Sequence, residues 1–231
     1  MQWASRVPMP KKLDLASMTV GDLPEPVINI QNCVATFNLL CSLNLKKMSL
    51  KENFFEFNPS KFAAATLRLK QPRTTALVFQ SGNVVCTGAK RELDSLLACR
   101  QFVRLLQRHD MRVSFSGFKI QNIVASTSTD GYPLKLQELA EDWGEYTSYE
   151  PELFPGLVLR ITEPRLVLLL FRSGKIVITG AKHKAQIRDT YKKVYYNIIR
   201  NYLDSKTSTF SSSVYRNQVK RDKIISSEKV S

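Results

Sequence analysis

Two stretches of the chain have the spacing of an amphipathic helix, and shorter stretches between them have the character of strands. The helical face of residues 91–109 is predicted to carry Leu93, Leu96, Leu97, Val103 and Leu106. That of residues 186–203 is predicted to carry Ile187, Tyr191, Val194, Ile198 and Tyr202. Residues 45–50 fit a short helix. Strands are predicted at 29–37, 62–69, 75–79 and 83–87, with a hairpin turn at Ser81 and Gly82.

These strands do not alternate between apolar and polar residues as strands with one wet face do. If Val84 and Cys86 face the helices, then Val85 and Thr87 face away from them. By the same alternation, the side chains that face away from the helices on the other strands are Leu77, Phe79, Leu169, Phe171, Val177 and Thr179. An outer face lined in this way exposes a large apolar patch, which is typical of a binding surface. A second covering layer or an obligate dimer is the alternative, but the chain offers no spare helix for it.

One sequence unit occurs twice, about ninety residues apart. The tripeptide Ile30-Gln31-Asn32 returns at residues 120–122, and Thr87-Gly88-Ala89-Lys90 returns at residues 179–182. Further pairs in the same order are Phe62 and Phe154, Arg68 and Arg160, Arg73 and Arg165, and Phe79 and Phe171. The order of elements predicts an α+β fold in which about ten antiparallel strands form one sheet covered on one side. A molecule with this pseudo-twofold symmetry suits a ligand with its own approximate twofold, such as duplex DNA.

The repeats define the expected domain boundaries. A single bilobed domain is predicted over residues 27–203, with repeats at about 27–115 and 116–203. Residues 1–26 have no sustained periodicity and are predicted to be a poorly ordered lead-in, and residues 204–231 a disordered basic tail rich in Ser and Thr. The lead-in lacks the apolar core of a signal peptide, and no apolar run approaches the length of a membrane span. We expect a protein of a reducing compartment, which is the nucleus if the ligand is DNA.

The net charge is +14, and about +11 of it lies on the two repeats. A folded core this basic usually binds a polyanion, although a merely basic soluble surface is the alternative. The four cysteines show no Cys-x-x-Cys spacing and the chain has two histidines, so the pattern does not favour a zinc site. No metal or other cofactor is expected. Cys33 and Cys86 lie in apolar strands and are predicted to be buried, reduced side chains.

An apolar sheet with basic edges suits the minor groove of A·T-rich DNA, whose floor carries only acceptors. Valine and leucine tolerate that floor but cannot satisfy the amino group that guanine adds. Asn32 and Asn122 should lie near the pseudo-twofold axis and donate their amides to the acceptors. Four of the twelve phenylalanines form two symmetric pairs, Phe62 with Phe79 and Phe154 with Phe171. Apolar wedges at base steps are how minor-groove proteins kink a duplex. Core packing is the alternative role for any one of them.

Three motifs carry a resemblance to a known family: residues 120–124 (IQNIV), 148–156 (SYEPELFPG) and 173–182 (SGKIVITGAK). Over about residues 27–203 the chain resembles the conserved core of the TATA-box-binding protein family. The resemblance implies a saddle with four helices on its convex side, a concave underside that binds TATA elements, and no enzymatic activity. The resemblance also implies that the bound DNA is bent by roughly 80°.

The resemblance also implies roles for matching residues. The intercalating wedges are Phe62, Phe79, Phe154 and Phe171, and the central minor-groove donors are Asn32 and Asn122. The remaining base contacts are Val34, Leu77, Val85, Thr87, Val124, Leu169, Val177 and Thr179. Phosphate contacts are Arg68, Lys90, Arg160 and Lys182.

The partner surfaces implied by the resemblance are less uniform. Glu150, Glu152 and Leu153 match the family's contact with transcription factor IIB, for which a Brf-type factor would substitute in RNA polymerase III transcription. Leu96 and Gln101 stand where family members commonly carry lysines that meet transcription factor IIA. Whether the protein binds transcription factor IIA and TBP-associated factors is therefore left open by the sequence. No membrane and no small-molecule substrate is expected.

Several functional alternatives stay open at this stage. The leading hypothesis is a promoter-binding factor that bends TATA-like DNA and nucleates preinitiation complex assembly. A specialised TBP-related factor, for a promoter subset or for RNA polymerase III, is one alternative, and a protein-binding scaffold on the same fold is another. A DNA-acting enzyme would need a nucleophile, base or metal, and His109 and His183 lie in contexts that form no such arrangement.

Overall fold

The computed structural model describes residues 13–15 and 26–204. The described strands are β1 (Leu13–Asp14), β2 (Asn29–Asn38), β3 (Ala64–Leu69), β4 (Thr74–Phe79), β5 (Asn83–Ala89), β6 (Ser116–Ser128), β7 (Thr147–Ser148), β8 (Gly156–Glu163), β9 (Leu166–Phe171) and β10 (Lys175–Ala181). The helices are α1 (Leu45–Lys51), α2 (Glu92–Arg108), α3 (Leu136–Asp142), α4 (Lys184–Asn197) and the 3-10 helix η1 (Ile199–Tyr202). The tail predicted at 204–231 lies outside the described residues, apart from Asp204.

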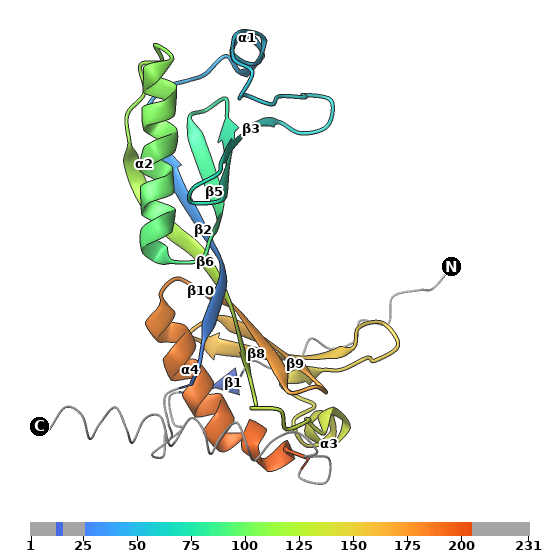
Figure 1. Cartoon of the computed structure of the whole chain (residues 1–231). Coiled ribbons are helices and arrows are strands. Elements are labelled where there is room, and N and C mark those ends of the chain that lie inside the picture. Colours follow the sequence, from blue (N-terminus) through green and yellow to red (C-terminus); the bar gives the residue numbers. More distant parts are fainter. Residues whose placement is uncertain (1–12, 16–25, 205–231) are drawn as a thin grey trace, which may run out of the picture.

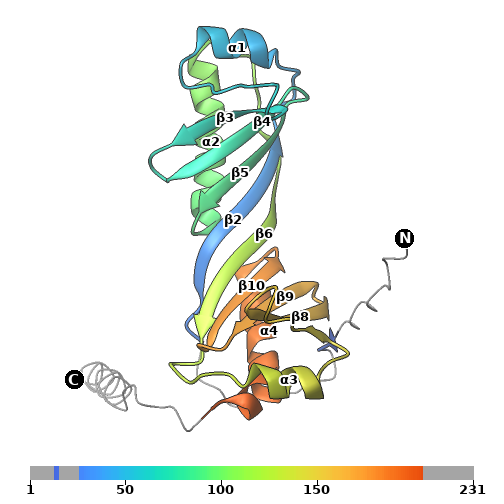
Figure 2. The same cartoon turned by 90° about the vertical axis from the view of Figure 1, so that its right-hand side faces the viewer.

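All described strands belong to one sheet with the order β1-β8-β9-β10-β6-β2-β5-β4-β3, and β7 also pairs with β8. Every pairing is antiparallel except that of β1 with β8. The sheet is long and curved, and its middle is formed by β2 and β6 (Figures 1 and 2). The predicted α+β class and the pseudo-twofold sheet of about ten strands are confirmed.

The two long helices α2 and α4 lie on the same side of the sheet, one over each lobe (Figure 1). The short helices α1 and α3 lie at opposite ends of the molecule (Figure 2). The other side of the sheet has no helix across its middle in either view, and we call it the open face. None of the helices in the described ranges is long and apolar enough to cross a membrane.

Burial along the strands follows the predicted parity. On β4, Ala76 and Val78 are buried against the helices, while Leu77 and Phe79 are only partly buried on the open face. Strands β5, β9 and β10 repeat the pattern. Apolar side chains therefore line both faces of each lobe, although helices cover only one.

The predicted face of α4 is confirmed, and that of α2 is wrong in part. All five residues predicted for the second helix are buried, although the helix changes to η1 after Ile198. On α2, Leu93 and Leu97 are 61% and 45% exposed. The buried stripe runs instead through Ser95, Ala98, Cys99, Phe102, Val103 and Leu106. Small residues at 95, 98 and 99 allow close approach of the helix to the sheet, which outweighs the gain from burying the two leucines.

Each lobe has its own apolar core, and the first strand of each repeat extends across both lobes. Ile30, near the start of β2, packs against the core of repeat two, whereas Phe37, near its end, belongs to the core of repeat one. Ile120 on β6 packs against both cores. Since β2 and β6 pair along most of their length, the two lobes share a continuous backbone ladder.

The predicted lead-in at 1–26 needs a correction at residues 13–15. Leu13 and Asp14 form β1, which pairs with β8, and the next residue, Leu15, is 1% exposed within the core of repeat two. The Lys193 ammonium of α4 donates a hydrogen bond of 3.0 Å to the Leu15 carbonyl. Three residues are too few to show a periodicity, so sequence patterning could not reveal them. Residues 1–12 and 16–25 lie outside the described part of the chain.

Candidate nucleic-acid interface

Two aromatic pairs occupy equivalent positions in the two lobes. The ring centroids of Phe62 and Phe79 are 6.2 Å apart with planes at 66°. Those of Phe154 and Phe171 are 5.9 Å apart at 69°. In each pair one ring comes from the segment before a strand, β3 or β8, and is exposed, at 50% for Phe62 and 39% for Phe154. The second ring of each pair ends β4 or β9 and supports the first, so each pair is a rigid apolar projection.

The two predicted central asparagines lie on the paired strands β2 and β6. Asn32 is the cross-strand partner of Val124, and Asn122 is the partner of Val34. The Asn32 side-chain oxygen accepts hydrogen bonds from the backbone N–H of Gly88 at 2.8 Å and from the Thr87 hydroxyl at 3.1 Å.

The second asparagine repeats the arrangement. Its oxygen accepts from the backbone N–H of Gly180 at 2.7 Å and lies 3.3 Å from the Thr179 hydroxyl. A backbone donor thus fixes the oxygen of each amide. The Asn122 NH₂ group also lies 3.1 Å from the Thr179 hydroxyl, to which it can donate one of its two hydrogens.

The donors to these amides depend on glycine. Gly88 has a φ of +105°, and a Cβ there would lie 2.9 Å from the Arg73 carbonyl oxygen. Gly180 has a φ of +102°, with the Arg165 carbonyl oxygen 2.8 Å from the same point. An L side chain is strained in this conformation and also collides with backbone, so both positions require glycine.

The predicted apolar floor is contiguous across the strands. Leu77 is the cross-strand partner of Val85, and Leu169 is the partner of Val177. Val34 and Val124 continue the floor on the central strands, where both are partly buried. The structure therefore brings all the predicted base-contact residues onto the open face.

The predicted phosphate contacts are exposed cations beside this face. Lys90 and Lys182 follow β5 and β10 directly and are exposed. Arg68 and Arg160 hold matching places on β3 and β8. Arg68, however, forms an ion pair of 3.3 Å with Glu56, which sequence patterning did not reveal. The position that matches Glu56 in repeat two is Ser148, because Glu56 pairs with Thr66 and Ser148 with Val158.

Gly156 is a further residue that the sequence analysis missed. A Cβ at this position would lie 2.7 Å from Phe154 Cε1 and 3.0 Å from Phe171 Cε1. The cross-strand partner of Gly156 is Phe171, just as Ala64 is the partner of Phe79 in repeat one. The mismatch between Ala64 and Gly156 in otherwise matching segments is the signal that could have identified it.

The predicted partner-binding residues lie in the loop before β8. Glu150, Glu152 and Leu153 are all exposed, and Leu153 is 82% exposed. The backbone N–H of Phe154 donates to the Glu150 carbonyl at 2.9 Å, so the loop that carries Leu153 also fixes a ring of the second aromatic pair.

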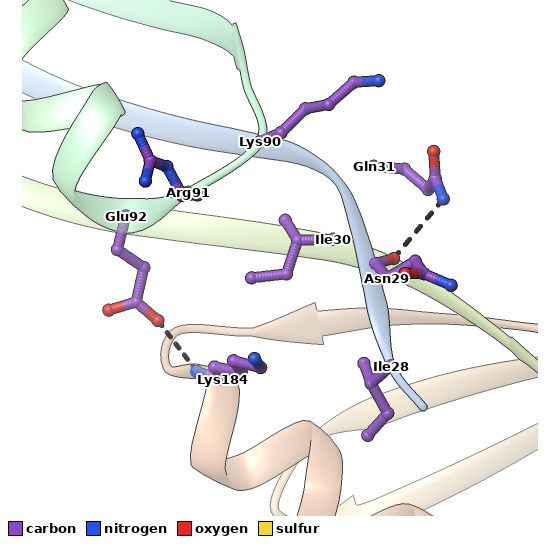
Figure 3. A pocket seen from close by; sticks show the side chains of 8 residues that line it. All are labelled: Ile28, Asn29, Ile30, Gln31, Lys90, Arg91, Glu92 and Lys184. Carbon is purple, nitrogen blue, oxygen red and sulfur yellow. Dashed lines mark hydrogen bonds between the residues drawn. The ribbon is translucent and has the colours of Figure 1, made fainter. Parts of the chain in front are cut away.

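A cleft of about 770 Å³ lies where the two lobes meet, between the start of β2 and the N-termini of α2 and α4. Its lining comprises Ile28, Asn29, Ile30, Gln31, Lys90, Arg91, Glu92 and Lys184. Figure 3 shows the Glu92 carboxylate directed at the first residue of α4, while the Lys90 ammonium points away from both. The Arg91 guanidinium is paired with Asp94 at 2.7 Å. The charges of Arg91 and Glu92 are thus used within the protein.

The cysteines and acidic residues do not assemble into a metal site within the described ranges. Cys33, Cys86 and Cys99 are buried and free, and burial raises the pKa of Cys33 to about 11. A thiol with this pKa stays protonated and packs as a small apolar side chain.

Comparison with models of known protein families shows to which family this chain is related. The family model described as "Transcription factor TFIID (or TATA-binding protein, TBP)" matches residues 27–109 and 117–202. The chain belongs to the TATA-binding protein family. The two matched ranges fall within the two predicted repeats, each of which corresponds to one copy of the family unit.

Individual members of the TATA-binding protein family agree with this result. The TATA-box-binding protein of Strongylocentrotus purpuratus is 49% identical over 169 residues, covering 73% of this chain and 63% of that protein. The TATA-box-binding protein of Bombyx mori is 47% identical, with 83% and 61% covered. The TATA box-binding protein-like 2 of Rattus norvegicus is 48% identical, with 73% and 49% covered. The chain thus spans about half to two thirds of the length of these relatives.

A solved structure of the family has the same fold. The Methanococcus jannaschii TBP superposes with a TM-score of 0.64 at 34% identity, and the match covers 73% of this chain and 96% of that one.

Proposed function

We propose that this protein binds A·T-rich, TATA-like promoter DNA in the minor groove with its open face, bends it, and nucleates a preinitiation complex in the nucleus. The observation that carries the proposal is the pair of amides, Asn32 and Asn122, whose oxygens are held by backbone donors and which lie between two aromatic pairs on an apolar floor. The naming of relatives as TATA-box-binding proteins supports it.

The chemistry of the open face matches the chemistry of an A·T minor groove. The groove floor carries adenine N3 and thymine O2 acceptors, which suit two amide NH₂ donors near its centre. Leu77, Val85, Leu169 and Val177 fit the smooth remainder of the floor. A guanine would place a donor against these apolar groups and leave it unsatisfied, so G·C pairs are disfavoured.

The two aromatic pairs account for bending. Inserting Phe62 and Phe154 at base steps on either side of the site unstacks those steps and kinks the duplex toward the major groove. The curved sheet then meets a bent groove along its whole length, and exposed cations such as Arg160, Lys90 and Lys182 contact the flanking phosphates.

The loop with Glu150, Glu152 and Leu153 is the surface that we propose binds a protein partner. Because Leu153 is 82% exposed and its neighbours are acidic, the loop suits a basic partner with a small apolar pocket. Transcription factor IIB or a Brf-type factor is the partner we infer, and the factor that forms a ternary complex on DNA identifies the polymerase.

The test is energy transfer across an end-labelled TATA duplex, compared with a duplex in which G·C pairs replace the A·T core. Wild-type protein should bind and bend only the first. Phe62→Ala and Phe154→Ala should each weaken binding by roughly tenfold or more and reduce bending. Tyr132→Ala removes an exposed aromatic ring from the loop between β6 and α3 and serves as the matched control. Equal binding of the two duplexes, or full bending by both Phe variants, contradicts the proposal.

A further inference from the structure

Two rows of side chains cross the open face of each lobe. In repeat one the outer row consists of Thr66, Leu77, Val85 and Thr36, which are successive cross-strand partners. In repeat two the same row consists of Val158, Leu169, Val177 and Ser126. We call the second row of cross-strand partners the inner row. It begins with Arg68, Thr75 and Thr87 in repeat one and with Arg160, Val167 and Thr179 in repeat two.

At two matched positions on this face, repeat one has threonine where repeat two has valine. Thr66 and Thr75 in repeat one correspond to Val158 and Val167 in repeat two, and all four side chains are partly buried. Threonine and valine have nearly the same shape, so the two halves present similar surfaces to a ligand. What differs is one hydroxyl at each position, which can both donate and accept a hydrogen bond.

These two hydroxyls are not used inside the described part of the protein. The Thr87 hydroxyl bonds Asn32, that of Thr179 bonds Asn122, and that of Thr36 accepts from Gln121. No hydrogen bond within the described residues involves the hydroxyl of Thr66 or Thr75. Both are thus available to a ligand on the open face.

We propose that repeat one accepts a base pair with a minor-groove amino group, such as G·C, whereas repeat two excludes it. The inference rests on the proposed function. A threonine hydroxyl accepts from the amino group of guanine and, over an A·T pair, donates to N3 or O2 instead. Valine does neither, so an amino group under Val158 or Val167 loses its hydrogen bonds to water without replacement. The half-sites differ in specificity, and this difference orients the pseudo-symmetric protein on asymmetric promoters.

The test uses a duplex with a palindromic, alternating A·T core and unlike flanks, so that either strand can be modified alone, and it replaces adenine by 2,6-diaminopurine, which adds only the minor-groove amino group. The modified base is placed at each adenine in turn in one half, and at the matching positions of both halves. Wild-type protein should bind the singly modified duplex within about twofold of the unmodified one, since it turns to place repeat one over the modification. The doubly modified duplex should bind about tenfold more weakly at one position at least, because repeat two must then meet an amino group.

Two double variants supply matched controls. Thr66→Val with Thr75→Val removes both hydroxyls and should make the singly modified duplex weak as well. Val158→Thr with Val167→Thr should restore tight binding of the doubly modified duplex. Binding of the unmodified duplex by each variant checks that it is folded.

The possible outcomes separate this inference from the proposed function. Equal weakening of wild type by single and double modification, or no response of either variant, overturns the inference and leaves the proposed function standing. Failure of wild-type protein to bind the unmodified duplex overturns both.

Discussion

The Glu92 carboxylate of repeat one accepts a hydrogen bond of 2.8 Å from the backbone N–H of Lys184, the first residue of α4 in repeat two. Glu92 itself is the first residue of α2, so the contact joins the N-termini of the two matched helices (Figure 3). A carboxylate at a helix N-terminus is favourable because it satisfies a free N–H group and opposes the helix dipole. Helix α4 therefore receives part of its cap from the other repeat.

Glu92→Ala should lower the free energy of unfolding by about 1 kcal/mol, in the range of a lost helix cap. Glu92→Gln keeps an acceptor but not the charge and should have a smaller effect. Urea denaturation measures both. Glu138→Ala, which removes an exposed ion pair with Lys135, is the control and should change stability by less than about 0.5 kcal/mol. An unchanged midpoint for Glu92→Ala would show that the contact does not couple the lobes.

Gly156→Ala should impair DNA binding more than folding. The added methyl would lie 2.7 Å from Phe154 and 3.0 Å from Phe171, so the rings must move apart or turn. We expect about tenfold weaker binding to a TATA duplex, because the wedge is displaced from its working position. The matched change in repeat one is Ala64→Gly, which removes a methyl instead of adding one and should leave the Phe62 and Phe79 pair in place. Measuring both by fluorescence anisotropy separates a wedge effect from a general loss of strand structure.

The parts of this molecule that could be predicted from the sequence are those determined by the alternation of residues along a strand and by the match between the two repeats. Strand parity placed Leu77 and Val85 on the open face, because burying Ala76 and Val84 leaves their neighbours no other side. The face of α2 could not be predicted, since Leu93 and Leu97 satisfy helical spacing but the sheet accepts the smaller Ala98 more closely. The hydrogen bond from Gly88 to Asn32 was also missed, because it depends on a bulge that no residue pattern defines.

Leu15→Ala should destabilise the protein although residue 15 lies outside the two repeats. The side chain is 1% exposed in the core of repeat two, and truncation of a buried leucine costs about 2–4 kcal/mol. Leu50→Ala, at a position that is 83% exposed, is the control and should have almost no effect. Thermal and urea unfolding of the full chain report the difference. Equal stability of the two variants would mean that β1 does not hold the edge of β8 in solution.

Glu56→Ala should strengthen DNA binding. Glu56 forms an ion pair of 3.3 Å with Arg68. In repeat two the counterpart of Arg68 is Arg160, and the position that matches Glu56 is the uncharged Ser148. The pair is about 60% exposed on both sides, so its loss should change stability by less than about 1 kcal/mol.

Freeing Arg68 adds a cation for the phosphate backbone, and the affinity at low salt should rise about two- to fivefold. Releasing a further counterion should also make the plot of log affinity against log salt steeper, by at most about one unit. Ser148→Glu is the converse change and should weaken binding by a similar factor through repeat two. Anisotropy titrations at several salt concentrations measure affinity and slope together. A Glu56→Ala variant with wild-type values for both would show that the ion pair does not limit phosphate contact by Arg68.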